Sequence, residues 1–420
     1  MLRSATGGEC VRAILHSDLN NFYASAECVY DPSLRNVPLA VCGDPEARHG
    51  IVLAKNMLAK QAGVTTGEAI WQAKQKCPGL VVIPPDYRKY LRFSRLMRQI
   101  YMQYTDRVEP FGLDECWLDV TGHEKSGEVI ADELRMRARE ELGLTVSVGV
   151  SFNKIFAKLG SDMRKPDATT VITHKNFREK VWPLPAGELL YVGPATRRKL
   201  ARRNILTIGD IARCEIRTLQ AAMGKTGVML WTFANGLDRS PVLAVGEEEA
   251  VKSVGNSTTT PRDVATDRDV RLVLMVLSES VAERLRDHGL RGRVVSLSVR
   301  DSELRCFGCQ HRLGRATALA SEICGCASAL FREHYRWERP VRSLGVSVSA
   351  LEPEDGDGQL SMFVDNALER RYALERTLGG IRQRFGHFAI QRASLISASE
   401  FGAINPRDDH LIHPVGWRER

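Results

Sequence analysis

Three acidic residues lie where they could bind divalent metal ions. Asp18 ends a short apolar run whose β-forming residues predict a strand. Asp114 and Glu115 separate two further strand candidates, residues 107–111 and 116–120, which resemble a β-hairpin with acids at its turn. Convergent carboxylates can hold two hard cations, which stabilise the attacking and leaving oxygens of a displacement at phosphorus. Because turns and strand ends often carry acids that only face water, this interpretation depends on the elements that bring the three together.

The surrounding elements predict a sheet in which those strands are neighbours. Residues 88–105 and 128–142 carry apolar side chains at helical spacing, and Gly143 ends the second helix. Residues 145–151 alternate in the manner of a strand. The order strand, helix, strand, strand, helix, strand is that of a split βαβ sheet with helices on one face. In this order the strand that ends at Asp18 lies beside the hairpin.

The rest of the chain divides into further parts. About sixty residues after the first strand are too many for a loop and predict a small domain. Short helices follow Pro183, and strands alternate with helices again over residues 253–350. Residues 352–358 are acidic and glycine-rich, which predicts an exposed linker, and a helix is expected at residues 366–384 before a polar tail.

Length and charge set broad limits. A chain of 420 residues is longer than one core usually grows, so several domains are expected. The formal net charge of +8 favours a polyanionic partner, although many soluble proteins are mildly basic. No stretch approaches the roughly 18 consecutive apolar residues of a membrane span, and we expect a cytoplasmic protein.

The cysteines are interpreted as reduced thiols. The chain has ten of them without a regular framework. Cys306, Cys309, Cys324 and Cys326 form a CxxC and a CxC with His311 nearby, which suggests zinc. The second pair lacks the usual ligand spacing, so buried or surface thiols are the preferred interpretation.

Three longer motifs surround the acids: residues 18–27 (DLNNFYASAE), 112–120 (GLDECWLDV) and 147–158 (SVGVSFNKIFAK). They resemble the three palm signatures of Y-family DNA polymerases, in the same order and at matching separations. The likeness runs from residue 11 to about residue 350 and is closest to the bacterial DNA polymerase IV branch.

The resemblance implies an α+β, multidomain right-hand polymerase. The expected parts are a split-βαβ, ferredoxin-like palm (9–27 and 88–175), small fingers (28–87), a helical helix-hairpin-helix thumb (176–242), a linker (243–252), an α/β little finger (253–351), and a linker with a clamp-binding peptide and C-terminal tail (352–420).

The implied function is template-directed addition of deoxyribonucleotides to a primer 3′ end in translesion synthesis. Asp18, Asp114, Glu115 and the main-chain carbonyl of Leu19 would bind two Mg²⁺ ions, for which Mn²⁺ could substitute. Low fidelity is expected, because the recognised domains consume nearly the whole chain and leave no space for a proofreading exonuclease. The expected partners are primer-template DNA, deoxyribonucleoside triphosphates and the bacterial sliding clamp, and the protein is expected to be a monomer.

The resemblance also assigns residues to the incoming nucleotide. Tyr23 would be the steric gate, whose ring leaves no room for a 2′-hydroxyl, and Phe22 would lie beside it. Lys60 and Lys165 would grip the triphosphate. Many relatives have arginine at position 60 and tyrosine where this chain has Met57, so the grip is expected to be a point charge rather than a bidentate clamp. Many relatives also have an acid where this chain has Asn20, a position outside the essential three.

DNA and clamp contacts complete the expected site. The sequence Val192-Gly-Pro-Ala195 resembles a helix-hairpin-helix turn, in which glycine lets backbone N–H groups approach a phosphate. The expected DNA-binding residues are Gly193, Arg197, Arg198, Lys199, Arg284 and Arg293. The peptide Gln359-Leu360-Ser361-Met362-Phe363 resembles the segment by which bacterial polymerases dock on the clamp, with Gln359, Leu360, Met362 and Phe363 as its anchors.

Two alternatives stay open at this point. A catalytically inactive DNA-binding accessory factor of the same fold is one, although such proteins lack the carboxylates that this chain retains. A helix-hairpin-helix repair protein without polymerase activity is the other, and it leaves the first 170 residues unexplained.

Overall fold

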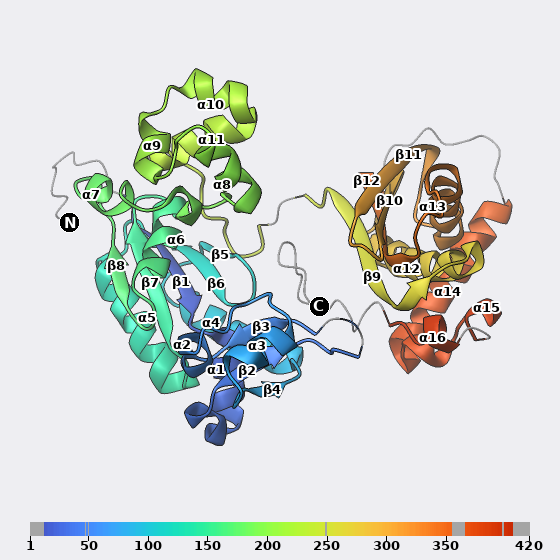
Figure 1. Ribbon diagram of the computed structural model, residues 1–420, viewed down its shortest axis with the longest axis horizontal. Helices are drawn as coiled ribbons and strands as arrows, with labels where there is room; N and C mark the ends of the chain where they lie inside the picture. The colour runs from blue at the N-terminus through green and yellow to red at the C-terminus, as the bar shows by residue number, and fades with distance from the viewer. Residues whose placement is uncertain are drawn as a thin grey trace, which may run out of the picture. The chain divides into compact units, whose positions relative to one another are not determined.

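The computed structural model describes residues 12–46, 48, 50–247, 250–354, 366–396 and 399–405. The chain forms two compact units, which divide close to residue 248. Each unit has its own sheet and core, and each is described by itself below (Figure 1). Among the described residues, no helix is both long and apolar enough to cross a membrane.

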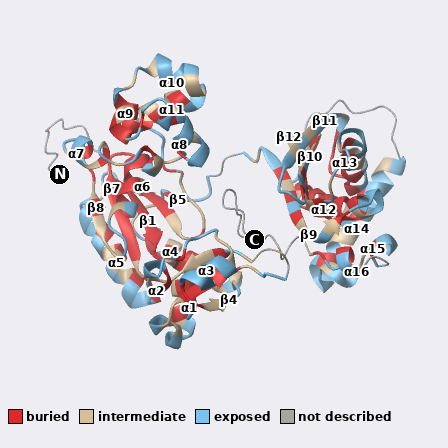
Figure 2. Ribbon diagram, viewed as in Figure 1, coloured by how far each residue is buried: buried red, intermediate tan, exposed pale blue. Residues whose placement is uncertain are grey.

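A five-stranded sheet forms the centre of the first unit, in the order β5-β6-β1-β7-β8. Its strands are β1 (Ile14–Leu19), β5 (Val108–Pro110), β6 (Glu115–Asp119), β7 (Val146–Ser151) and β8 (Thr169–Val171). β1 is antiparallel to both of its neighbours, β6 and β7. All six residues of β1 and of β7 are buried, as Figure 2 shows for the middle of the sheet. The predicted split βαβ order is confirmed, and β8 adds a parallel edge strand.

Helices cover both faces of this sheet, whereas the sequence predicted helices on one face. The helices are α1 (Phe22–Tyr30), α4 (Tyr87–Tyr101), α5 (Gly127–Leu142) and α6 (Lys154–Met163). The start of α5 packs near Val150 and Leu15, because a Cβ on Gly127 would meet both side chains within 3.2 Å. A Cβ on Gly149, the neighbour of Val150, would lie 1.9 Å from the Ala157 carbonyl of α6. Successive strand residues face opposite ways, so α6 covers the face opposite α5.

The expected insertion is a small subdomain with its own three-stranded sheet, in the order β3-β2-β4. Its elements are η1 (Pro32–Asn36), β2 (Leu39–Cys42), β3 (Val52–Lys55), α2 (Met57–Gln61), α3 (Ile70–Lys76) and β4 (Val81–Ile83). A separate small core, which includes Ala40, Val52 and Leu80, holds it together. Short helices follow the sheet: α7 (Phe177–Val181), η2 (Ala186–Glu188), α8 (Pro194–Ala201), α9 (Ile208–Arg213), α10 (Ile216–Met223) and α11 (Lys225–Ala234).

The second unit is a four-stranded antiparallel sheet with helices, in the strand order β11-β10-β12-β9. Its elements are β9 (Ser253–Val264), α12 (Asp267–Asp287), β10 (Leu290–Asp301), β11 (Cys306–Thr317), α13 (Ala320–His334), β12 (Val341–Pro353), α14 (Asn366–Phe385), η3 (His387–Ala389), α15 (Ala393–Ile396) and α16 (Ser399–Gly402). Tyr372, Leu395 and Phe401 are buried in the core of this unit. The C-terminal segment expected as a tail is therefore, from α14 to α16, part of the second unit.

Candidate active site

The strand pairing brings the predicted carboxylates together on one side of the sheet. Asp18 near the end of β1 lies directly opposite Glu115 at the start of β6. The backbone of Leu19 is tied to the next acid, because its N–H donates to the Asp114 carbonyl at 3.0 Å. The sequence placed all three acids correctly, since their proximity follows from the strand order.

The same side of the sheet carries residues that the sequence interpretation missed. His16 precedes Asp18 by two strand positions and therefore faces the same way. Its Nδ1 lies 2.8 Å from Ser161 Oγ of α6, and its Nε2 lies 3.3 Å from Glu115 Oε2. Lys158 of α6 forms an ion pair with Glu115. The even spacing of His16 and Asp18 along a strand was the available signal for the histidine.

Burial and mutual repulsion shift the pKa values of the acids. Burial raises the pKa of Asp18 to about 7, with the charge of Glu115 adding to it and Lys165 opposing it. Burial, and after it the charge of Glu115, raises the pKa of Asp114 to about 6. Burial acts upward on Glu115 too, but His16 and Lys158 outweigh it and hold its pKa at about 2. Burial thus works against the charged forms of Asp18 and Asp114, whereas His16 and Lys158 favour the charged form of Glu115.

Lysines pair with two of these acids. Lys165, in the turn between α6 and β8, places its Nζ 2.7 Å from Asp18 Oδ2 and 2.8 Å from Asp162 Oδ1. Lys158 pairs with Glu115 in the same manner. Over the described residues, no three His, Cys, Asp or Glu side chains lie close enough together to hold a metal ion. Joint binding of a cation by the three acids therefore requires their side chains to turn from these lysines.

A stack of tyrosines lies beside the acids. Tyr23 of α1 is half-buried, and its ring lies parallel to that of Tyr90 in α4. Tyr87 contacts Tyr23 edge-on at 6.0 Å, and Phe22 is buried next to it with its centroid at 5.6 Å. Burial and the nearby charge of Asp114 raise the pKa of Tyr23, so its hydroxyl stays neutral. The predicted gate residue is thus held close to Asp114 by a rigid aromatic wall.

The small subdomain presents a second cation pair. Lys60 is exposed in α2, and Lys55 ends the adjacent strand β3. Burial, followed by the positive charge of Lys60, lowers the pKa of Lys55, and the Lys55 ammonium donates to Thr66 Oγ1 at 3.0 Å. Asn56 caps the helix that carries Lys60, since its side chain accepts from the Ala59 N–H at 3.0 Å. Lys55 is a further cationic residue here that the sequence interpretation did not name.

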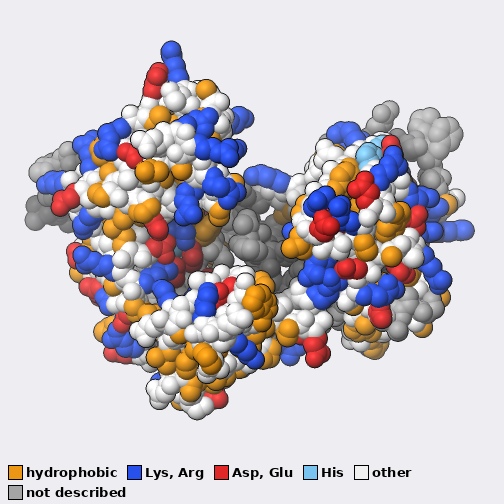
Figure 3. Space-filling model, viewed as in Figure 1, with side chains coloured by type: hydrophobic (Ala, Val, Ile, Leu, Met, Phe, Trp, Pro, Cys, Tyr) orange, Lys and Arg blue, Asp and Glu red, His pale blue; other side chains and the backbone are white. Residues whose placement is uncertain are grey.

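The expected helix-hairpin-helix turn lies at the start of α8. Gly193 is its N-cap residue and Pro194 its first helical residue, an arrangement typical of helix starts. The basic residues that follow are exposed, and Figure 3 shows Lys and Arg side chains gathered over α8 and α10. They are Arg197, Arg198, Lys199, Arg202 and Arg203.

The two arginines expected to bind DNA in the second unit make internal contacts. Arg284 of α12 donates from Nη1 to the Gly255 carbonyl at 2.9 Å. Arg293 of β10 pairs with Glu352 of β12, with Nε 2.9 Å from Oε2. The side chain of Arg293 is about one-third exposed. Their contact with DNA stays a prediction.

The remaining predicted features lie elsewhere. The clamp peptide, residues 359–363, falls outside the described residues. Of the four cysteines considered for zinc, Cys306 is exposed on β11, Cys309 and Cys326 are half-buried, and Cys324 is buried in α13.

Sequence comparisons identify a family for each major part of the chain. Residues 17–162 match the impB/mucB/samB family, and residues 251–362 match the C-terminal domain of that family. Residues 188–238, which contain α8 to α11, match a model described as the thumb domain of DNA polymerase iota. The three matches follow the order of the predicted palm, thumb and little finger.

Whole-chain relatives agree with these matches. DNA polymerase IV of Acetivibrio thermocellus is 51% identical over 389 residues, covering 92% of this chain and 98% of the relative. DNA polymerase IV 2 of Bacillus subtilis is 36% identical over 92% of this chain and 95% of the relative. The solved structure of a Y-family DNA polymerase chimera superposes with a TM-score of 0.70 at 23% identity, covering 80% of this chain and 98% of the chimera, which supports the right-hand fold.

Proposed function

The chain belongs to the impB/mucB/samB family and is a translesion DNA polymerase of the Y family, and we propose that Asp18, Asp114 and Glu115 are its catalytic metal ligands. The observation that carries the proposal is the cross-strand pairing of Asp18 with Glu115, next to Asp114. Like charges directly opposite in a sheet destabilise it, and a cation bound between Asp18 and Glu115 would relieve that repulsion.

The donor set fits magnesium. The three carboxylates, with the main-chain carbonyl of Leu19, offer only hard oxygen atoms, which Mg²⁺ prefers and which Mn²⁺ also accepts. Bound ions would supply charge stabilisation for the attacking primer oxygen and the leaving pyrophosphate. The raised pKa values of Asp18 and Asp114 support the assignment, because a bound cation would stabilise the charged forms that burial disfavours.

Lysine side chains would bind the triphosphate of the incoming nucleotide. Lys165 lies next to Asp18 and is about 29% exposed, so its ammonium is open to an incoming anion. When Asp18 binds a cation, Lys165 loses part of its attraction to that carboxylate and can turn to a phosphate oxygen. Lys60 and Lys55 lie on neighbouring elements of the small subdomain and would add charge to the same ligand.

Tyr23 would select the sugar. Its ring stacks on Tyr90 and contacts Tyr87 edge-on, and these two rings also contact each other, so the cluster opposes any movement of Tyr23 that would admit a 2′-hydroxyl. A ribonucleotide would clash with the ring, whereas a deoxyribonucleotide would pack on it. Phe22 is buried next to Tyr23 and would support the ring of Tyr23 in the same sugar pocket.

Primer-template DNA would be held without regard to sequence. The backbone N–H groups at the start of α8, after Gly193, can approach a phosphate, and Arg197, Arg198 and Lys199 add a salt-dependent attraction. Arg293 and Arg284 would act in the second unit. We further propose that residues 359–363 bind the bacterial sliding clamp, and that the protein acts as a monomer in the cytoplasm, where its DNA substrate lies.

Primer extension tests the metal assignment. Asp114→Ala should abolish extension at every Mg²⁺ concentration, because removal of one shared ligand disables both cation positions. Asp119→Asn is the matched control, since Asp119 ends β6, the strand that begins directly after Asp114, and its side chain accepts from the Thr121 N–H. Undiminished synthesis by Asp114→Ala would remove this residue from the site, and equal loss in both variants would show that the hairpin had misfolded.

A further inference from the structure

Several side chains from outside the turn hold the backbone of the turn that carries Lys165. Lys165 lies between the end of α6 at Met163 and the start of β8 at Thr169. A lysine side chain has four rotatable bonds and loses much conformational freedom when it is fixed, so the backbone beneath it must be well defined if the ammonium is to reach one point. The contacts that define this backbone come from residues outside the turn.

Asn20 forms the first support. It follows Asp18 by two positions and is 4% exposed. Its Oδ1 accepts from the Asp167 N–H at 2.8 Å, and its Nδ2 donates to Ser147 Oγ of β7 at 2.9 Å. Asp18 contacts Lys165, and Asn20 contacts Asp167, so the end of β1 and the turn are joined by two contacts at matching two-residue intervals.

The backbone conformation of Asp167 is unfavourable and needs stabilising contacts. Its φ of +54° lies in the left-handed region, which is unfavourable for a residue other than glycine and is tolerated best by Asn and Asp. Arg135 of α5 grips it at two atoms: Nε lies 3.1 Å from Asp167 Oδ1, and Nη2 donates to the Asp167 carbonyl at 2.5 Å. Arg139, one helical turn further along α5, also forms an ion pair with the Asp167 carboxylate.

We propose that Asn20, Asp167 and Arg135 are positioning residues that fix Lys165 for the incoming triphosphate. The inference rests on the proposed role of Lys165. Asn20, the residue after β1, and Arg135 of α5 both contact Asp167, so the turn is held between the end of a central strand and a covering helix. Neither residue touches the substrate. Both act by holding the Lys165 backbone at a fixed distance from Asp18.

Substitutions at position 20 can test whether the hydrogen bond to the Asp167 N–H matters. A carboxylate at this position can keep both contacts, because Ser147 Oγ can donate where it now accepts. The amide and the acid are therefore expected to be interchangeable for positioning. An apolar residue of similar size would fill the space but would leave the Asp167 N–H without its side-chain acceptor.

The test measures nucleotide binding apart from chemistry. The full-length protein is bound to a primer-template whose primer ends in a dideoxynucleotide, and the Kd for the next complementary deoxyribonucleoside triphosphate is measured in Mg²⁺. Asn20→Leu and Arg135→Met should each raise this Kd by about three- to tenfold, the equivalent of one lost hydrogen bond. Asn20→Asp should stay within about twofold of the native protein. In turnover, the first two variants should raise KM for the nucleotide more than they lower kcat.

Arg137→Gln is the matched control. Arg137 lies on the same helix, between Arg135 and Arg139, and pairs with Glu141 rather than with the turn. Its Kd should equal that of the native protein. Asn20 is buried and Asn20→Leu could fail to fold, which a thermal unfolding curve would reveal. Arg135 is about one-quarter exposed, so Arg135→Met carries the test in that event.

Lys165→Met separates this inference from the proposal beneath it. If Lys165→Met raises the Kd, and Arg135→Met adds nothing further in the Lys165→Met background, Arg135 acts through Lys165. If Lys165→Met raises the Kd while Arg135→Met and Asn20→Leu leave it unchanged, the positioning role is wrong and the triphosphate role stands. An unchanged Kd in Lys165→Met would overturn both.

Discussion

The ring of Tyr23 lies parallel to the ring of Tyr90, with the two centroids 4.2 Å apart and an interplanar angle of 6°. Tyr90 is in turn fixed at its hydroxyl, which donates to Glu27 Oε1 at 2.9 Å and accepts from the Asp86 N–H at 3.2 Å. Lys89 also pairs with Glu27, at 2.7 Å. The ring of Tyr23 is thus held by a chain of contacts that runs from α4 back to its own helix α1.

This rigidity makes a prediction about sugar selection. Tyr23→Ala should let the enzyme incorporate ribonucleotides far more readily, with a rise of at least about 100-fold in relative kcat/KM, because the clash with the 2′-hydroxyl is removed. Competing ribo- and deoxyribonucleotides in single-nucleotide extension measure the effect. Tyr23→Phe keeps the ring and should keep the selectivity. Unchanged discrimination in Tyr23→Ala would remove Tyr23 from its role.

The proximity of Asp18 and Glu115 could be predicted from the sequence, and their surroundings could not. Asp18 and Glu115 meet because of strand order, which alternating patterns reveal. Their partners depend on how α6 packs on the sheet. The sequence predicted no helix on that face, so the pairing of Lys158 with Glu115 was missed. Long charged side chains reach several possible partners, and only packing selects one.

The short strand β8 and the packing of the C-terminal helix could not be predicted from the sequence for a different reason. β8 has three residues, too few for a periodic signal to appear, and it is fixed by pairing with β7. The helix at residues 366–384 was predicted well, but its docking was not. Its sequence is mostly polar, and the residues it buries include two charged ones, Glu375, which pairs with Arg286, and Arg382, which pairs with Glu279. Burial of charges by mutual pairing leaves no hydrophobic stripe in the sequence.

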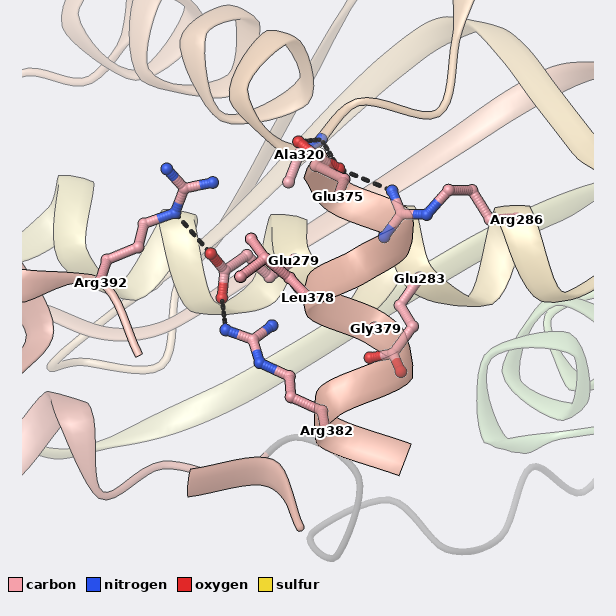
Figure 4. A pocket seen from close by; sticks show the side chains of 9 residues that line it. All are labelled: Glu279, Glu283, Arg286, Ala320, Glu375, Leu378, Gly379, Arg382 and Arg392. Carbon is pink, nitrogen blue, oxygen red and sulfur yellow. Dashed lines mark hydrogen bonds and ion pairs between the residues drawn. The ribbon is translucent and has the colours of Figure 1, made fainter. Parts of the chain in front are cut away.

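Those buried charges predict a stability effect in the second unit. Glu279 of α12 lies between two arginines of the C-terminal segment, as Figure 4 shows: Arg382 at 2.8 Å and Arg392 at 2.5 Å. Glu279 and Arg382 are each about 8% exposed. Glu279→Leu should lower the free energy of unfolding by about 3 kcal/mol, since removal of one partner leaves a buried guanidinium without its counter-charge.

Urea denaturation of the full chain, followed by circular dichroism, measures this loss. Arg376→Gln is the matched control: Arg376 also lies on α14 and pairs with Glu354, but its side chain is 62% exposed. An exposed pair contributes at most about 1 kcal/mol, so this variant should unfold nearly as the native protein does. Equal losses in the two variants would contradict the view that Glu279 anchors the C-terminal helices.

Position 60 offers a test of the triphosphate grip. Lys60 is an exposed point charge, whereas arginine can hold two phosphate oxygens at once. Lys60→Arg should therefore lower KM for the nucleotide by about three- to tenfold with little change in kcat. Steady-state extension measures both constants. Lys74→Arg, an exposed lysine of α3 in the same subdomain, should change neither. A KM that rises in Lys60→Arg would show that the lysine is fitted to its site.

Clamp binding is best tested by substitution rather than by deletion. Glu354, the residue after β12, pairs with Arg376 of α14, and substitution leaves the length of chain between them unchanged. Replacing Leu360, Met362 and Phe363 by alanine keeps the length and removes the apolar anchors. Stimulation of primer extension by the sliding clamp should be lost, and extension without the clamp should be unchanged.

The control for this experiment lies beside the peptide. Asp355→Asn with Asp357→Asn alters the acidic stretch before the peptide and keeps its apolar anchors. Both activities should persist in that variant, because groove binding of this kind depends on the apolar side chains. If the alanine variant loses clamp-independent extension to the same degree as the stimulated reaction, the segment contributes to the polymerase itself. The clamp assignment would then have to be abandoned.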